Sequence, residues 1–376
     1  MAKVLVPKER RPGETRVAAT PETVKKMVKE GLAVAVERGA GDSAFFPDAQ
    51  YEAAGAAVVA TPDWAAADVV LKVGPLESGE ALRPGGVLIA FLAPHRNLDM
   101  VRRLVEGNAS SLALELVPRI TRAQGMDALS SQASIGGYKA VLLAAVHLPK
   151  YLPLLMTAAG TIKPAKVIVM GAGVAGLQAI GTARRLGAVV EVSDVRPAVK
   201  EQVESLGGRF IQLPMLEEMS GEGTGGYARQ MGEDFLVRQR EIVRQHLTTA
   251  DAAITTALVP GKPAPLLLTR DMVEAMRPGS VIVDLAIEQG GNCELSEADR
   301  EIVHDGVRIL APSNLPATMP QDASTLYARN VLALLLHIAK KGELALDPED
   351  EIVRGTLLTH AGRVVHGPTA ELLVSV

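Results

Sequence analysis

The chain has 376 residues, of which 48% are hydrophobic and only 3% aromatic, and its formal net charge is −4. This length suffices for two ordinary α/β domains with aliphatic cores. The small negative charge provides no basic face, which argues against nucleic acid and anionic membranes as partners. The single cysteine, Cys293, excludes an internal disulfide and fits a reduced, cytosolic setting, with a small buried side chain as its simplest role.

The sequence predicts no targeting or membrane-spanning segment. The start, MAKVLVPKER, lacks a hydrophobic core of signal-peptide length and is typical of a strand. The longest apolar stretch, residues 140–160, is interrupted by His147, Lys150 and two prolines. We therefore expect a soluble protein without direct membrane insertion.

Short apolar strands alternate with helices along most of the chain. Helix signals include Thr20 as N-cap and Pro21 at the first position of a helix that ends before Gly31. Strands are expected at residues 3–7, 33–37, 68–73, 86–92, 111–117, 166–170, 209–213, 251–258, 280–285 and 307–311, and helices at 98–107, 138–147, 199–206, from about 269 and at 323–341. Near the end, a hairpin should turn at Ala361 and Gly362. This order predicts an α/β fold of two doubly wound Rossmann-like domains with parallel sheets, separated by a cleft.

The two domains are expected to be 1–137 plus 322–376, built from both chain ends, and 138–321. Residues 119–137, RITRAQGMDALSSQASIGG, are polar and show neither helix nor strand period. We interpret them as a loop near the domain junction that carries functional side chains, with a solvated linker as the alternative.

A dinucleotide-binding fingerprint lies at residues 166–194. An apolar strand is followed by GAGVAG, an amphipathic helix and a second strand that ends at Asp194. Gly171 permits the tight turn, Gly173 leaves room for a pyrophosphate, and Gly176 lets the helix approach the sheet. The pyrophosphate would bind N–H groups at the helix N-terminus. A purely structural glycine turn is the weaker alternative.

Asp194 is the candidate acceptor for the adenosine ribose hydroxyls, and its charge would repel a 2′-phosphate. NAD is therefore favoured over NADP. Arg196 leaves NADP open, because an arginine there could accommodate a 2′-phosphate; a solvated surface charge is its other interpretation. Two further features point to a ligand. One is a glycine-rich loop that ends with Gly226 and Tyr227; this loop could close over a bound ligand or merely be a flexible surface loop. The other is Glu288, which lies just past the carboxyl end of a strand.

Other catalytic motifs are missing from the sequence. The seven histidines show no metal-binding spacing, and there is no HExxH, GxSxG or Walker motif, so we predict no metal site. Hydride transfer is the default chemistry of such a nucleotide site.

Several runs together resemble the NAD(H)-binding component of proton-translocating nicotinamide nucleotide transhydrogenase. They are SSQASIGGYKAV, GAGVAGLQAIGTARRLGAVVEVSDVR, KEQVESLGG, LVPGKPAP, VIVDLAIEQGGNCELSE and SNLPATMPQDAS. The resemblance extends from the first strand to about Gly342 and is shared, more distantly, with alanine dehydrogenase. Arg16 and Lys72 match that enzyme's substrate pocket, but Ala93 stands at its histidine position, with His95 two residues later, and Glu288 at its aspartate position. Loss of the candidate proton-transfer histidine disfavours amino-acid oxidation.

The resemblance implies that hydride passes directly between NADH bound here and NADP(H) bound on a partner subunit. It implies that Arg119, Asp127 and Ser130 orient the NADH carboxamide, that Gln124 bridges toward the second nucleotide, and that Tyr227 closes the site. Cofactor binding is assigned to Gly171, Gly173, Val174, Ala175, Gly176, Asp194, Val195, Arg196, Gly226, Ala257, Leu258 and Glu288.

The resemblance also implies partners. They are NADP-binding and membrane-spanning subunits that couple the reaction to proton translocation, and a second copy of the chain in a homodimer. The chain would then be a cytoplasmic subunit, peripheral on the cytoplasmic side of the inner membrane. The alternatives are an alanine or related amino-acid dehydrogenase and a non-catalytic NAD-binding module.

Overall fold

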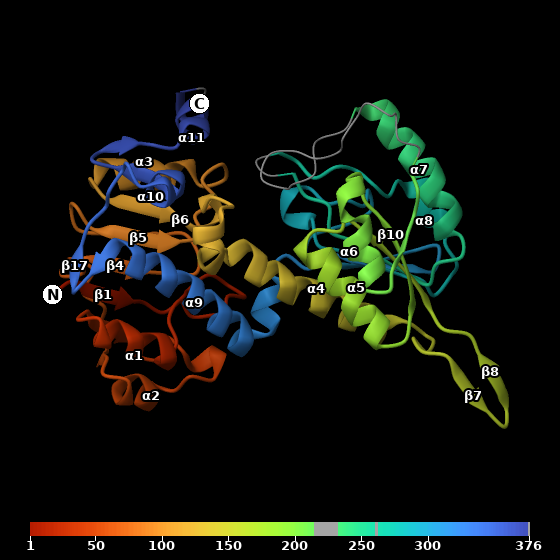
Figure 1. Cartoon of the computed structure of the whole chain (residues 1–376), viewed down its shortest axis with the longest axis horizontal. Coiled ribbons are helices and arrows are strands. Elements are labelled where there is room, and N and C mark those ends of the chain that lie inside the picture. Colours follow the sequence, from red (N-terminus) through yellow and green to blue (C-terminus); the bar gives the residue numbers. More distant parts are fainter. Residues whose placement is uncertain (214–231, 260–261, 375–376) are drawn as a thin grey trace. The chain divides into compact units, whose positions relative to one another are not determined.

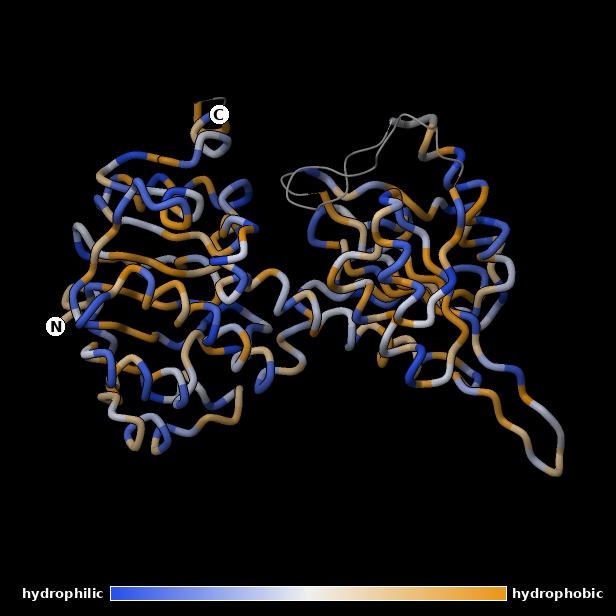
Figure 2. The backbone as a smooth tube through the Cα atoms, in the orientation of Figure 1, coloured by the Kyte–Doolittle hydropathy of each residue, from blue (hydrophilic) through white to orange (hydrophobic). Residues whose placement is uncertain are grey.

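The computed structural model describes residues 1–213, 232–259 and 262–374. The chain forms two compact units, and both chain ends belong to the first (Figure 1). Unit 1 comprises Met1–Gln132 and Pro316–Val376, and unit 2 comprises Ala133–Leu315. Each unit is built around one sheet, and the middle of each unit is rich in hydrophobic residues (Figure 2).

The sheet of unit 1 has eight strands in the order β19-β18-β6-β5-β4-β1-β2-β3. Strands β1 to β6 pair in parallel, whereas β18 joins β6 antiparallel. The bounds are β1 Lys3–Val6, β2 Ala33–Glu37, β3 Ala57–Val59, β4 Val69–Leu71, β5 Val87–Ala90, β6 Ser110–Ala113, β18 Leu357–His360 and β19 Arg363–Val364. The chain passes from β3 back across β1 to β4, so the sheet changes winding direction between β1 and β4.

Helices cover both faces of this sheet, because neighbouring strand residues belong to different cores. Val4 and Val6 pack into one hydrophobic core, and Leu5 between them packs into another on the opposite face. The helices are α1 Pro21–Lys29, α2 Asp48–Ala53, α3 Leu98–Glu106, α9 Pro320–Ile338, α10 Glu351–Thr356 and α11 Gly367–Val374. The 3₁₀ turns η1 Asp42–Ala44, η2 Leu114–Leu116, η3 Thr121–Met126 and η7 Leu315–Thr318 and the small pair β16 Ala339–Lys340 and β17 Glu343–Leu344 complete the unit's elements.

The sheet of unit 2 has seven strands in the order β11-β10-β9-β12-β13-β15-β14. It is parallel apart from the edge strand β14, and its winding direction changes between β9 and β12. The bounds are β9 Lys166–Met170, β10 Val189–Ser193, β11 Arg209–Phe210, β12 Ala252–Thr255, β13 Val281–Asp284, β14 Glu301–His304 and β15 Val307–Leu310.

Two cores again lie on opposite faces of this sheet, since Val167 and Val169 pack into one and Ile168 and Met170 into the other. The helices are α5 Val174–Arg185, α6 Lys200–Ser205, α7 Glu233–Leu247 and α8 Arg270–Glu274, with α4 Ala128–His147 leading into the unit and short turns η4 Pro197–Val199 and η6 Ile287–Gln289. A hairpin of β7 Leu155–Thr157 and β8 Gly160–Ile162 projects from the body of unit 2 (Figure 1).

The α/β class and the doubly wound arrangement are confirmed, with one correction to the sheets. Each sheet carries antiparallel strands at an edge, because the hairpins β14–β15 and β18–β19 return the chain directly. The second of these turns at Ala361 and Gly362, which have φ of 49° and 70°, as the sequence predicts.

The prediction of a loop over residues 119–137 is wrong for most of that segment. Residues 121–126 form the turn η3, and α4 begins at Ala128. Asp127 starts this helix: its carboxylate accepts hydrogen bonds from the N–H of Ser130 at 2.9 Å and from the Ser130 hydroxyl at 2.6 Å. Helical periodicity is invisible here because α4 has apolar and small residues all around its axis.

Within the described ranges, none of the helices is both long and apolar enough to cross a membrane.

Candidate functional site

The glycine-rich turn after β9 is packed so closely that two of its glycines have no room for a side chain. Gly171 adopts φ of 101°, and a Cβ atom there would lie 2.7 Å from Thr256 Oγ1. A Cβ atom on Gly176 would lie 1.8 Å from the carbonyl oxygen of Gly171. The Thr256 hydroxyl also donates a hydrogen bond to that oxygen at 2.9 Å. These contacts hold the first turn of α5 against the end of β9.

Gly173 is different, because the space beside it is open. A Cβ atom built there has no neighbour within 4 Å among the described residues. Gly173 is the N-cap residue of α5, so the helix that starts at Val174 has no capping side chain. The first N–H groups of this 12-residue helix therefore face space that an anion can occupy.

Asp194 at the end of β10 braces this turn. One carboxylate oxygen accepts the Ala172 N–H at 2.6 Å and Arg196 Nη2 at 2.8 Å, and the other accepts the Arg196 N–H at 2.8 Å and Nε at 3.0 Å. Both side chains are buried, so the interpretation of Arg196 as a solvated surface charge is wrong. The sequence did not reveal this pairing because it depends on a backbone bend between residues 194 and 196.

A cavity of about 270 Å³ opens beside Asp194. It is lined at the carboxyl ends of β10 and β11 by Asp194, Val195, Pro197, Lys200, Phe210, Gln212 and Leu213. Its walls are mainly apolar, and Asp194, Lys200 and Gln212 are its charged and polar residues. Such a lining suits an adenosine whose ring is buried and whose ribose is hydrogen-bonded. The predicted residue Val195 therefore lies in a cavity next to the turn.

The other predicted cofactor residues lie at the same edge of the sheet. Ala257 and Leu258 follow β12, the strand beside β9, and Glu288 is exposed on η6, just after β13. Ala257 exchanges two hydrogen bonds with the side chain of Asn292, at 3.0 and 2.9 Å. Gly226 and Tyr227 lie outside the described residues.

Asp284 organises this edge, and sequence reasoning missed its role. Its buried carboxylate accepts hydrogen bonds from five donors: the Thr255 and Ser296 hydroxyls and the N–H groups of Ala286, Asn292 and Cys293, at 2.8 to 3.0 Å. A carboxylate that ends an apolar strand and precedes the segment AIEQGGN was the available signal. Through these five hydrogen bonds, Asp284 fixes the loop that carries Glu288.

The predicted site residues of the polar segment after Arg119 differ in their burial. Asp127 and Ser130 are half-buried and hydrogen-bonded to each other, whereas Arg119 and Gln124 are exposed. Asn330 of α9, about 200 positions further along the chain, anchors the segment by donating to the Gly125 carbonyl at 2.9 Å and accepting from the Ser131 hydroxyl at 2.7 Å. Nothing near Asn330 in the sequence indicates this role.

For the hydride transfer that the resemblance implies, we expect Asn330→Ala to lower the rate several-fold with little change in the affinity for NADH. The variant frees the Gly125 carbonyl and the Ser131 hydroxyl, so the segment with Gln124 and Asp127 loses its anchor. Steady-state transfer rates and NADH titration check this. The exposed Arg329→Ala is the matched control from the same helix, and an equal loss of transfer there would contradict an anchoring role for Asn330.

Ala93 and His95, which bear on the alanine dehydrogenase alternative, lie in the loop after β5. Ala93 adopts φ of 42°, and its N–H donates to the half-buried carboxylate of Glu115. His95 lines a separate surface cavity of about 420 Å³ with Arg96, Arg102 and Arg103. Partial burial and the neighbouring Arg96 lower the pKa of His95.

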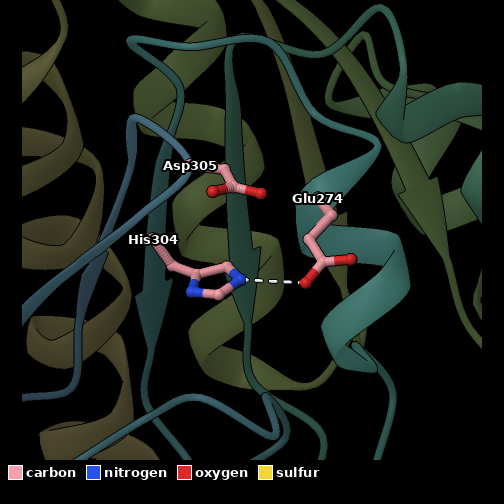
Figure 3. Close-up of side chains that lie close together, drawn as sticks. All are labelled: Glu274, His304 and Asp305. Carbon is pink, nitrogen blue, oxygen red and sulfur yellow. Dashed lines mark hydrogen bonds and ion pairs between the residues drawn. The ribbon is translucent and has the colours of Figure 1, made fainter.

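Glu274, His304 and Asp305 form one group of possible metal donors among the residues with described positions (Figure 3). Their donor atoms lie within 4.8 Å of one another, and His304 Nε2 is hydrogen-bonded to Glu274 at 3.0 Å. The group lies at the turn that precedes β15, hence at the amino ends of the parallel strands. The glycine-rich turn lies at the carboxyl ends, so this surface group has no place in the nucleotide site.

Comparisons with known proteins identify the family of the two units. Residues 5–136 match the family model "Alanine dehydrogenase/PNT, N-terminal domain" and residues 140–367 match "Alanine dehydrogenase/PNT, C-terminal domain". The chain is 49% identical to the first portion of NAD(P) transhydrogenase subunit alpha of Rhodospirillum rubrum, over 97% of this chain and 98% of that protein. A solved structure of transhydrogenase from Sinorhizobium meliloti is 47% identical with a TM-score of 0.88, covering 96% of this chain and 99% of the other.

Similarity to the dehydrogenase branch is weaker. Alanine dehydrogenase of Halomonas elongata is 31% identical, over 98% of this chain and 96% of that protein. Identity over nearly the whole chain, together with both domain matches, leads to one conclusion: this protein belongs to the alanine dehydrogenase/PNT family, on the side of the transhydrogenase alpha subunits.

Proposed function

We propose that the chain binds NAD(H) in unit 2 and exchanges hydride with NADP(H) held by a partner subunit of a transhydrogenase. The observation that carries this proposal is the N-terminus of α5, which has no capping side chain and is open at Gly173. Asp194 accepts a hydrogen bond from the same turn and lines a cavity large enough for an adenosine. The similarity to transhydrogenase alpha subunits supplies the reaction. Proton translocation then belongs to membrane-spanning partners, with this subunit bound peripherally on the cytoplasmic side.

The chemistry of such a transfer is a matter of positioning. Hydride passes between two nicotinamide C4 atoms without a general acid or base, so the rate depends on near-attack geometry and exclusion of water. In the proposal, Arg119, Asp127 and Ser130 orient the carboxamide, and Gln124 reaches toward the second nucleotide. The Asp127–Ser130 hydrogen bonds support this, because they hold two of these groups rigidly at the start of α4. Tyr227 is proposed to close the site.

NAD(H) is the proposed ligand of unit 2 because Asp194 borders the cavity and carries a negative charge. The positive charge of Arg196 compensates part of that negative charge, and its guanidinium forms an ion pair with the Asp194 carboxylate itself. A 2′-phosphate beside Asp194 would therefore be repelled, and the other charged residue that lines the cavity, Lys200, lies 3.9 Å from the carboxylate of Glu204.

We expect Asp194→Asn to narrow the preference for NADH over NADPH at least several-fold, because the repelling charge is lost and the Arg196 guanidinium is released. The amide can still accept the Ala172 N–H, so the turn should persist. Fluorescence titration with both nucleotides measures the ratio. Unchanged rejection of NADPH by a folded variant would remove Asp194 from a role in discrimination.

The experiment that tests the function is transfer of hydride from NADH to an NADP⁺ analogue. The purified chain is assayed alone and then with the soluble NADP-binding domain of a related transhydrogenase. Transfer only in the mixture is the expected result. Absence of transfer in the mixture, with NADH bound, would indicate a non-catalytic binding module, and alanine-dependent reduction of NAD⁺ by the chain alone would indicate an amino-acid dehydrogenase.

We further propose that the chain is a homodimer. The hairpin β7–β8 exposes apolar side chains that a partner could cover, with Leu154 54%, Met156 73% and Ile162 41% exposed. Light scattering is expected to give twice the chain mass of 39.5 kDa. Met156→Asp should shift the population toward monomer, and a monomeric parent protein would refute the proposal.

A further inference from the structure

The β14–β15 hairpin of unit 2 turns at Asp305 and Gly306. His304 pairs with Val307 across the hairpin, so these two residues form the whole turn. Their φ values are 48° and 78°, and positive φ at both positions is the type I′ geometry that an Asp-Gly pair favours. The turn therefore fixes Asp305 directly beside His304.

This turn is packed against the segment that follows α8. The Gly279 N–H donates a hydrogen bond to the Gly306 carbonyl at 2.8 Å. Val273 of α8 belongs to the same hydrophobic core as Val307 of β15. Glu274, the next residue and the last of α8, is therefore held beside the hairpin by packed elements and not by a free loop.

Glu274, His304 and Asp305 bring one imidazole nitrogen and two carboxylates to one place (Figure 3). Their donor atoms all lie within 4.8 Å of one another, and His304 Nε2 lies 3.0 Å from a Glu274 oxygen. Donors of a tetrahedral Zn²⁺ site lie roughly 3.3 to 3.5 Å apart. Glu274 and Asp305 are exposed, so their carboxylates can rotate into that spacing.

The negative charge of the two carboxylates is not balanced by a lysine or arginine. Within the described residues, the Glu274 carboxylate pairs only with His304, and the Asp305 carboxylate forms no ion pair or hydrogen bond. Arg277 donates instead to backbone carbonyls that follow α7, at 3.3 Å, and Arg308 is paired with a carboxylate of β14. Like charges this close repel each other, so a divalent cation between them would be stabilising.

We propose that Glu274, His304 and Asp305 form a Zn²⁺ site that ties the end of α8 to the β14–β15 turn, with water completing the coordination. Mixed nitrogen and oxygen donors favour Zn²⁺, whereas Mg²⁺ and Ca²⁺ prefer oxygen ligands alone. The inference does not depend on the proposed function, because the site is at the amino ends of the parallel strands, opposite the glycine-rich turn. The sequence predicts no metal site because short spacing patterns do not connect residues 30 positions apart.

Equilibrium dialysis of the whole chain against Zn²⁺ tests the site. We expect one saturable site per chain with a dissociation constant below about 100 μM. Zn²⁺ at about ten times that constant should raise the melting temperature by roughly 3 °C, and Mg²⁺ at the same concentration should not. Absence of saturable Zn²⁺ binding below about 100 μM would overturn the proposal.

Two conservative variants and one control identify the ligands. Asp305→Asn removes a ligand charge and keeps the turn, because asparagine also adopts positive φ. It should weaken Zn²⁺ binding at least about tenfold, and so should Glu274→Gln. His337→Gln is the matched control: its imidazole also pairs with a carboxylate, that of Asp350 at 2.9 Å, but it belongs to no group of three donors among the described residues. Unchanged binding by Asp305→Asn, or an equal loss in His337→Gln, would overturn the proposal.

A direct readout with the parent protein requires no variant to fold. Zn²⁺ should shift the ring resonances of His304 in NMR spectra and leave those of His337 in place, because only the first imidazole is expected to bind the ion. A shift of the His337 resonances without a shift of those of His304 would place the ion at another histidine and overturn the proposal.

Discussion

Gly173→Ala is expected to weaken NADH binding by more than about tenfold, equivalent to about 1.4 kcal/mol, while leaving the fold intact. The new Cβ atom meets nothing within 4 Å among the described residues, and Gly173 has φ of −75°, which alanine adopts readily. In the proposed site the pyrophosphate occupies that open space beside the N–H groups of α5, so the methyl group is expected to displace the ligand and not the protein. NADH titration with a parallel melting curve measures both effects.

Gly176→Ala is the matched control from the same turn, and we expect the reverse pattern. Its Cβ atom would lie 1.8 Å from the Gly171 carbonyl oxygen, so α5 must move away from β9. The cost should be about 3 kcal/mol or more of stability, with binding lost as a consequence. If Gly173→Ala binds NADH normally, the pyrophosphate does not lie at this turn. If Gly176→Ala is as stable as the parent, the close packing described here is wrong.

The second large effect concerns pH. Burial raises the pKa of Glu9 to about 7, although the nearby Lys72 ammonium and the hydrogen bond from the Val73 N–H both lower it. The folded protein therefore keeps a proton on Glu9 at pH values where the unfolded chain has lost it. Stability from this group should fall as the pH rises from about 4.5 to about 7, by about 3 kcal/mol in total, and then level off.

Glu9→Gln should remove that contribution. The amide oxygen can still accept the Val73 N–H, and Glu80 still neutralises Lys72. Urea denaturation at several pH values is expected to show a flatter pH profile for the variant. The difference in stability between variant and parent should change between about pH 4.5 and 7 and be constant outside that range. A parent profile as flat as that of the variant between about pH 4.5 and 7 would mean that Glu9 ionises in the folded protein at its ordinary pKa.

Much of the architecture was predictable because it depends on local sequence. Alternation of apolar strands and helices predicted the α/β class. Gly362 in the hairpin turn and Gly171 in the fingerprint are the residue type that their positive φ favours. The helix α4 was predicted only from residue 138 onward. Its true start depends on Asp127 acting as a cap, and an aspartate about ten residues before an apolar run gives no periodic signal.

The predicted site residues differ in how far sequence could place them. Gly171, Gly173 and Gly176 lie in one turn, so their spacing alone brings them together. Asn330 donates a hydrogen bond to the Gly125 carbonyl, and Asp284 accepts one from the Cys293 N–H at the end of its loop. Such contacts depend on which segments of the chain become neighbours in the fold.

The sequence by itself thus determined the fold class and, through the resemblance of several runs, the family. It also predicted the turn proposed to bind a nucleotide, since a glycine fingerprint depends on residue types at fixed short spacings. Only the tertiary structure decided that Arg196 is buried against Asp194 and that Lys72 is buried beside Glu80 and Glu9. The physical reason is that a charge's environment depends on burial and on its neighbours in space. The order of strands in the sheet sets both, and no local pattern encodes that order.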